Sequence, residues 1–207
     1  MFLAVPKTGS TAFESALAGR AAIAVTQPPE LKHAPVFRYN RYFRPMIERF
    51  MSSDVDIVAV MREPISWLGS WYRYRHRAAA AGQPGSTLGM TFDAFVTAYC
   101  EGDPPLFARV GSQAKFLEPQ RNGTRVTHLF RYEDQPGLIA FLESRLDTRL
   151  EIPTMNCSPV LPTALTATTE ARLRRKFAAD FSLWHGIGTQ GQYLPHAARP
   201  VPEGKPD

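Results

Sequence analysis

A lysine and a run of small hydroxyl residues follow the first apolar stretch of this 207-residue chain. Residues 3–5 are apolar, Pro6 ends the stretch, and the next five positions suit anion binding: Lys7, Thr8, Gly9, Ser10 and Thr11. Apolar side chains then recur at helical spacing, so the segment predicts a strand over 2–5, a tight turn and a helix over 9–19. In such a turn, backbone N–H groups converge on a phosphate, the helix N-terminus adds positive potential, and the lysine adds a point charge. The turn therefore predicts a binding site for a phosphorylated nucleotide.

A second expected junction of strand and helix carries an arginine and a serine that also suit anions. The β-branched run at 55–61 predicts a buried parallel strand, and Arg62 follows at its carboxyl end, where ligands bind in open α/β sheets. Pro64 suits the first turn of the helix that we expect over 64–80. Ser70 lies about two turns into that helix and can face the ligand that Arg62 binds. A guanidinium fork and a hydroxyl together suit a phosphate monoester.

The two junctions together resemble the sulfotransferase family, and they occur in the order in which that family carries them. Pro-Lys-Thr-Gly-Ser-Thr at 6–11 resembles the loop that binds the 5′-phosphosulfate of PAPS (3′-phosphoadenosine 5′-phosphosulfate). Arg-x-Pro-x5-Ser-x-Tyr at 62–72 resembles the segment that binds the 3′-phosphate. Tyr132, where an expected strand over 125–132 ends, resembles the tyrosine that lies near the adenine. The loop at 6–11 is not a Walker A motif, because its lysine precedes a single glycine.

The resemblance implies a fold, a cofactor and roles for particular residues. The fold would be a P-loop-like parallel sheet flanked by helices in a single domain, with PAPS as the donor and PAP (3′-phosphoadenosine 5′-phosphate) as the product. Lys7 and the loop N–H groups would stabilise the leaving 5′-phosphate. His33 would be the general base, because Lys-His-Ala-Pro at 32–35 resembles the stretch that carries the base in some carbohydrate sulfotransferases. Glu14 is the rival base, and in the first turn of the expected helix it could equally be a charge that favours the helix N-terminus.

The acceptor that we expect is a small molecule or a saccharide, most simply a hydroxyl group of a carbohydrate or glycoconjugate. The arginines and tyrosines at 38–42 suit a polar or acidic acceptor, and they equally suit the packed start of a helix. The sequence does not identify the acceptor or the oligomeric state.

Two other classes of function stay open at this point. One is a P-loop-type phosphotransferase, that is, a kinase. A kinase would need an aspartate to hold Mg²⁺, but Asp54 and Asp56 lie at the wrong end of the expected strand, so we expect no metal site. The other is a non-catalytic protein that binds PAP or a related nucleotide. The net charge of +5 attracts anions in general, and the anionic PAPS is enough to account for it. The aromatic residues fall mostly on helical core stripes, so we expect no nucleic-acid partner.

Length and composition indicate a globular protein with a single domain. The chain is long enough for one domain with a sizeable core, which we place at 1–194, followed by a disordered tail at 195–207. Its longest apolar runs fall short of the roughly 20 residues of a membrane span. The N-terminus lacks a signal-peptide pattern and there are two cysteines, so we expect a cytoplasmic bacterial protein.

The remaining elements follow from hydrophobic periodicity. A short strand over 21–25 and a loop over 26–36 precede a helix over 41–51. The glycine-rich stretch at 81–90 could be a lid over the acceptor or a plain linker loop, and we favour the plain loop. Further helices are expected over 91–99, 108–118, 136–147 and 169–184. Strands that alternate with helices predict an α/β protein with a parallel sheet.

Overall fold

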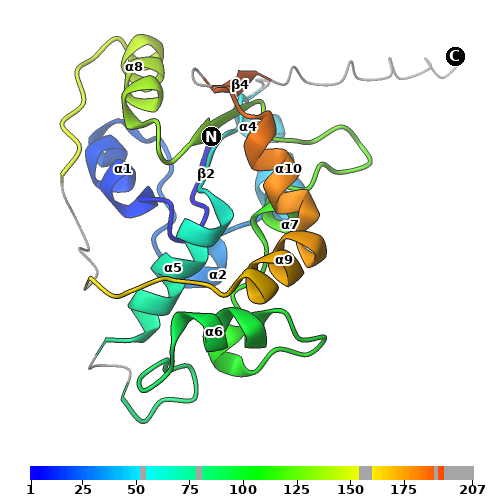
Figure 1. Cartoon of the computed structure of the whole chain (residues 1–207). Helices are drawn as coiled ribbons and strands as arrows, with labels where there is room; N and C mark the ends of the chain where they lie inside the picture. The colour runs from blue at the N-terminus through cyan, green and yellow to red at the C-terminus, as the bar shows by residue number, and fades with distance from the viewer. Residues whose placement is uncertain (52–54, 78–80, 154–159, 189–190, 194–207) are drawn as a thin grey trace, which may run out of the picture.

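The computed structural model describes most of the chain, at residues 1–51, 55–77, 81–153, 160–188 and 191–193. The tail expected over 195–207 and the end of the helix expected over 64–80 therefore lie outside the described residues. Within them, helices surround a small sheet (Figure 1).

The sheet has four strands in the order β1-β2-β3-β4. β1 (Phe2–Leu3), β2 (Val58–Met61) and β3 (His128–Arg131) are parallel, and β4 (Gln192–Tyr193) adds to β3 in the antiparallel direction. Helices connect the parallel strands, as such crossovers require. The prediction of an α/β protein with a parallel sheet flanked by helices is confirmed.

The helices fall into three stretches of chain. Between β1 and β2 lie α1 (Ser10–Leu17), η1 (Ala18–Arg20), α2 (Pro29–Lys32), α3 (Val36–Arg38), the π-helical turn η2 (Tyr39–Phe43) and α4 (Arg44–Met51). Between β2 and β3 lie α5 (Pro64–Arg75), α6 (Phe92–Tyr99), the 3-10 turn η4 (Leu106–Ala108) and α7 (Gln113–Phe116). After β3 come α8 (Gln135–Leu146), α9 (Ala167–Lys176) and α10 (Ala178–Gly186).

The two faces of the sheet are covered by different helices. Val58 and Val60 of β2 pack with side chains of α1 and α8, which lie close together in Figure 1. Ala59 and Met61, whose side chains point the other way, pack with residues of α3, η2 and α4. All four residues of β2 are buried, which explains the unbroken apolar run in the sequence. A third cluster, between α5, α6, α9 and α10, lies beyond the sheet and supports α5.

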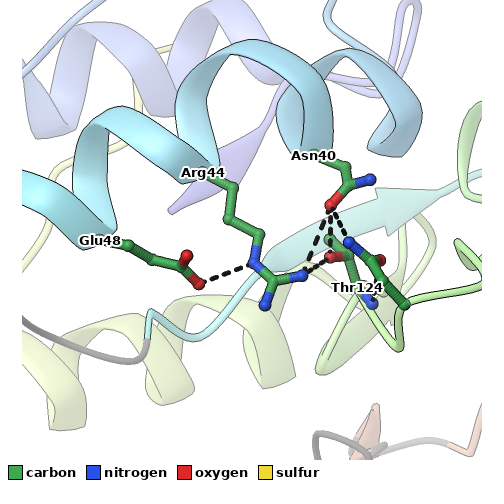
Figure 2. Close-up of polar contacts among 5 residues, drawn as sticks. Asn40, Arg44, Glu48 and Thr124 are labelled. Atoms are coloured by element: carbon green, nitrogen blue, oxygen red, sulfur yellow. Dashed lines mark hydrogen bonds and ion pairs between the residues drawn. The ribbon is translucent and has the colours of Figure 1, made fainter. Parts of the chain in front are cut away.

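A polar network fastens α4 to the segment that leads into β3 (Figure 2). Arg44 pairs with Glu48 at 2.8 Å and its guanidinium also donates to the hydroxyl of Thr124. The Thr124 hydroxyl donates to the amide oxygen of Asn40 at 2.7 Å. Asn40 lies in the π-helical turn, so this wider turn places its side chain within reach of the loop.

Four expected elements differ from the structure. Residues 21–25 form no strand; Ala21 to Ala24 are exposed, and alanine has a low strand propensity. The helix expected over 108–118 is reduced to α7, because Gly111 has a φ of 78° and Ser112 begins a new helix as its N-cap. The helix expected over 169–184 is broken at Phe177, which stacks on Tyr99 at 4.3 Å. The helix expected over 41–51 begins earlier, at α3.

Candidate functional site

The loop between β1 and α1 has an unusual backbone that its neighbours hold in place. Lys7 and Gly9 both adopt left-handed φ angles, 66° and 75°. The Thr8 hydroxyl donates to the carbonyl of Val5 at 2.8 Å, and the indole N–H of Trp67 donates to the carbonyl of Pro6 at 2.8 Å. Gly9 is the N-cap of α1, and no side chain caps this helix. The N–H of Ala12 donates to the Gly9 carbonyl at 3.0 Å, so the N–H groups that precede it at the start of α1 are the ones open to an anion. Such groups suit a bound anion.

Four cationic side chains gather at this loop. The pKa of Lys7 is lowered to about 8 by burial first, and then by repulsion from Arg77, Arg62 and Arg73. The Lys7 ammonium lies 4.2 Å from the ring centroid of Tyr74, and Arg77 lies 4.8 Å from the same ring. Within the described part of the chain, none of the four cations forms an ion pair with a carboxylate. An anionic ligand would relieve the mutual repulsion of these charges.

Arg62 lies at the carboxyl end of β2, directly beside the loop. Its Nε donates to the hydroxyl of Ser66 at 2.9 Å, and its Nη1 donates to the carbonyl of Lys7 at 3.4 Å. Its guanidinium carbon lies 4.3 Å from the centroid of the Tyr132 ring. The same ring lies 3.2 Å from the point where a Cβ on Gly9 would be. The structure therefore brings together Lys7, Gly9, Arg62 and Tyr132, which come from three different segments.

α5 presents its polar residues along one face. Within α5, Ser66, Ser70 and Arg73 are spaced by four and three residues, which places them on one side of the helix. Arg77 lies two residues beyond the end of α5, and its charge, like that of Arg73, acts on Lys7. Ser70 is buried one turn beyond Ser66, and it is Ser66 that contacts Arg62. The hydroxyl residues of the loop are Thr8, just before α1, and Ser10 and Thr11, at its start. Thr8 and Ser10 are buried, and Thr11 is half-buried.

A buried amide holds the backbone of Arg62. The N–H of Arg62 donates to the side-chain oxygen of Gln113 at 2.9 Å, and the side-chain nitrogen of Gln113 donates to the carbonyl of Arg62 at 2.8 Å. Asp180 in turn accepts from the N–H groups of Gln113 at 2.8 Å and Ala114 at 3.2 Å, and from the hydroxyl of Ser112 at 2.7 Å. Burial raises the pKa of Asp180, and these hydrogen bonds oppose that shift. We call this set Ser112, Gln113, Ala114 and Asp180 the Arg62 clamp.

The clamp is the part of the site that sequence reasoning missed. Gln113 lies 51 residues from Arg62 in the chain, and its sequence neighbours carry no anion-binding pattern. Asp180 lies in the helix expected over 169–184, and helical periodicity does not reveal what its carboxylate contacts. The sequence does show Gln113 and Asp180 among apolar residues. That pattern predicts buried side chains that form hydrogen bonds, but it does not identify their partners.

The two candidate bases lie on the β1 side of the loop. His33 ends α2, and its Nδ1 lies 2.6 Å from the carbonyl oxygen of Ala4. Because a carbonyl can only accept, Nδ1 carries the proton and Nε2 of the neutral ring keeps its lone pair. Glu14 pairs with Lys32 at 2.6 Å and lies in the second turn of α1, not in the first as expected. One carboxylate oxygen of Glu14, Oε2, is therefore engaged by an ammonium, whereas Nε2 of His33 can accept a proton while Nδ1–H bonds the Ala4 carbonyl.

Two of the residues expected to contact an acceptor have other roles. Tyr39 is 3% exposed and belongs to the core, and burial raises the pKa of its hydroxyl. Arg38 donates to the carbonyl of Glu30 at 2.6 Å. The interpretation of residues 38–42 as a polar acceptor site is therefore wrong for Tyr39, and the packed start of a helix accounts for it.

Neither a group of metal-ligating side chains nor a helix long and apolar enough to cross a membrane occurs among the described residues. No family model, curated protein or solved structure matches this chain.

Proposed function

We propose that this protein is a P-loop-like sulfotransferase that moves a sulfuryl group from PAPS to an acceptor hydroxyl. The observation that carries the proposal is the gathering of Lys7, Arg62, Arg73 and Arg77 at a left-handed loop that begins a helix. A nucleotide with a 3′-phosphate and a 5′-phosphosulfate carries several negative charges close together, and four cations beside uncapped N–H groups match that charge.

Each residue has a distinct proposed role. Arg62 would bind the 3′-phosphate, since Ser66 and the clamp fix its orientation while its Tyr132 contact shields it from water. Lys7 and the N–H groups at the start of α1 would bind the 5′-phosphosulfate. Tyr132 would contact the adenine with the ring face opposite Arg62.

The transfer itself requires in-line geometry and charge stabilisation. The acceptor oxygen forms a bond to sulfur as the bond from sulfur to the 5′-phosphate oxygen breaks. His33 accepts the hydroxyl proton at Nε2, because Nδ1–H is held by the Ala4 carbonyl. Lys7 and the loop N–H groups stabilise the charge that develops on the leaving phosphate.

The direct test is transfer of a radiolabelled sulfuryl group from PAPS to a panel of sugars and sugar-headed amphiphiles. We expect PAP release and a labelled acceptor in the absence of added metal. His33→Ala should lower the rate by about 100-fold or more, as for loss of a general base, and leave PAP affinity unchanged. His185→Ala is the matched control, because His185 is exposed and its Nδ1 likewise bonds a carbonyl, that of Phe181.

Three outcomes separate this proposal from its alternatives. PAP binding without transfer to any acceptor would favour a binding protein. Transfer of a phosphoryl group from ATP would favour a kinase. Equal loss of transfer in His33→Ala and His185→Ala would contradict the role of His33.

A further inference from the structure

An open cavity of about 550 Å³ runs along the outer edge of β1. Met1 to Ala4 form one wall, α1 and residues 21–25 form another, and α4 contributes Met46 and Ile47. The segment at 21–25, which the sequence predicts as a strand, lines the same cavity as β1 and is not paired with it. A volume of this size is in the range of small-molecule sites, about 300–1,000 Å³.

The cavity collects a large share of the apolar surface that the protein exposes. Six large apolar side chains that line it are each more than a third exposed, at 38% for Met1, 52% for Ile23, 38% for Leu31, 37% for Met46, 50% for Met51 and 36% for Leu146. Scattered exposed apolar residues need no explanation, but a concave group of them marks a binding site. The concave shape favours a small molecule over a flat protein surface.

The polar residues that line the cavity are few and mostly engaged. Glu14 pairs with Lys32 at 2.6 Å, and Asp56 pairs with Arg145 at 2.9 Å. Arg20 donates to the hydroxyl of Thr148 at 2.5 Å. A sugar held in the body of the cavity would lack hydrogen-bond partners, and a charge placed there would lose its hydration without gaining a partner. The body of the cavity therefore suits a hydrocarbon or aryl group.

One end of the cavity reaches the proposed catalytic loop. Ser10, the first residue of α1, lines it, and so do Lys32 and Ala34, which flank His33. Ala4 also lines it, and its carbonyl holds His33. The opposite end lies near Asp56 and Arg145, at the amino ends of the strands. An elongated ligand in the cavity would therefore have one end beside the loop and His33.

We propose that this cavity binds the apolar part of an amphiphile whose hydroxyl-bearing head lies at the end formed by Ser10 and the Glu14–Lys32 pair. The binding site stands on its own observations; the identification of this amphiphile as the acceptor rests on the proposed function. The acceptor class becomes a hydroxylated head, such as a sugar, on a single apolar tail.

The test measures the binding of dodecyl maltoside, below its critical micelle concentration, by calorimetry. The variant Ile23→Glu/Met46→Glu places two charges in the cavity at positions that are already partly exposed. Val160→Glu is the matched control, because Val160 is 99% exposed and does not line the cavity. Thermal unfolding of each variant checks that it is folded. We expect saturable binding to the wild type, at least tenfold weaker binding to the double variant, and no change for Val160→Glu.

The outcomes separate the cavity from the proposed function. The absence of amphiphile binding to the wild type, or an equal loss in Val160→Glu, would overturn the cavity proposal. Self-association of the wild type that the double variant abolishes, without amphiphile binding, would overturn it in favour of a protein interface. Binding of dodecyl maltoside by a protein that does not bind PAP would support the cavity and contradict the sulfotransferase. Transfer of the label to the maltoside head would support both.

Discussion

Replacing Gln113 by leucine tests whether the Arg62 clamp holds the proposed donor site. The side-chain amide of Gln113 makes two hydrogen bonds to Arg62, at 2.9 Å to the N–H and at 2.8 Å to the carbonyl. Gln113 itself is 1% exposed, so water has little access to replace these bonds. Each buried backbone group left without a partner costs about 1–3 kcal/mol. Gln113→Leu should therefore lower the free energy of unfolding by about 2–4 kcal/mol, measured by urea denaturation.

The same variant should weaken PAP binding, because the backbone that carries the Arg62 guanidinium loses both of its fixed contacts. We expect PAP affinity to fall about tenfold or more, since small displacements of binding groups have large effects. Gln113→Glu is the sharper companion variant. Its first carboxylate oxygen still accepts from the Arg62 N–H, but its second faces the Arg62 carbonyl and repels it. Protonation of the carboxyl restores a donor at that position.

The sign of the pH dependence follows from this geometry. Burial raises the pKa of a carboxyl group, so the introduced glutamate should be protonated at acidic pH and ionised at higher pH. The stability difference between Gln113→Glu and wild type should therefore shrink as the pH falls and grow as it rises. A loss of less than about 1 kcal/mol of unfolding free energy in Gln113→Leu, together with unchanged PAP affinity, would show that the clamp does not hold Arg62.

Three further predictions follow from the site. Burial and neighbouring arginines lower the pKa of Lys7 to about 8, and a bound anion favours its charged form. PAP affinity of wild type, measured by calorimetry, should therefore fall about tenfold between pH 7 and pH 9. Lys7→Arg should show no such fall, because arginine stays charged over this range. Gly9→Ala should cost about 1–2 kcal/mol of unfolding free energy, because Gly9 has a φ of 75° and the Tyr132 ring lies 3.2 Å from the position of the new Cβ. The control Gly19→Ala has open space around the new Cβ and should cost less. Equal costs in the two variants would contradict this prediction. Asp180→Asn keeps a side-chain oxygen that can accept from the N–H groups of Gln113 and Ala114. In urea denaturation it should lose about half as much unfolding free energy as Asp180→Ala. Because burial raises the pKa of Asp180, the contribution of this group to the unfolding free energy falls as the pH rises above about 4. The unfolding free energy of wild type relative to Asp180→Asn should therefore fall over that range.

The class of fold and the position of the loop could be predicted from the sequence because their signals are local. The apolar run at 55–61 and the change to helical spacing after Gly9 report strand and helix directly. The carboxyl ends of parallel strands meet at one edge of the sheet, so Lys7 and Arg62 could be expected near each other although 55 residues separate them.

What could not be predicted depends on contacts between distant segments. Helical spacing makes both Ser66 and Ser70 face the ligand side, and only the rotamer of Arg62 decides that Ser66 is its partner. The clamp links Arg62, Gln113 and Asp180, which lie in three segments whose local sequences predict only an ordinary helix or loop. The run at 21–25 resembles a strand by its apolar residues, yet a strand also needs a hydrogen-bonded neighbour, and the segment lines the cavity beside β1 without pairing with it.

Calorimetry of PAP and ATP binding without added metal shows whether the loop and Arg62 form a site for PAP. The comparison uses wild type, Arg62→Ala and the control Arg149→Ala, whose side chain is 94% exposed beyond the end of α8. We expect micromolar PAP binding, much weaker ATP binding, and a loss of PAP affinity of about 100-fold in Arg62→Ala alone, as for removal of a charged hydrogen-bonding partner. A failure of wild type to bind PAP, tighter binding of ATP, or equal affinity in wild type and Arg62→Ala would contradict the proposed PAP site.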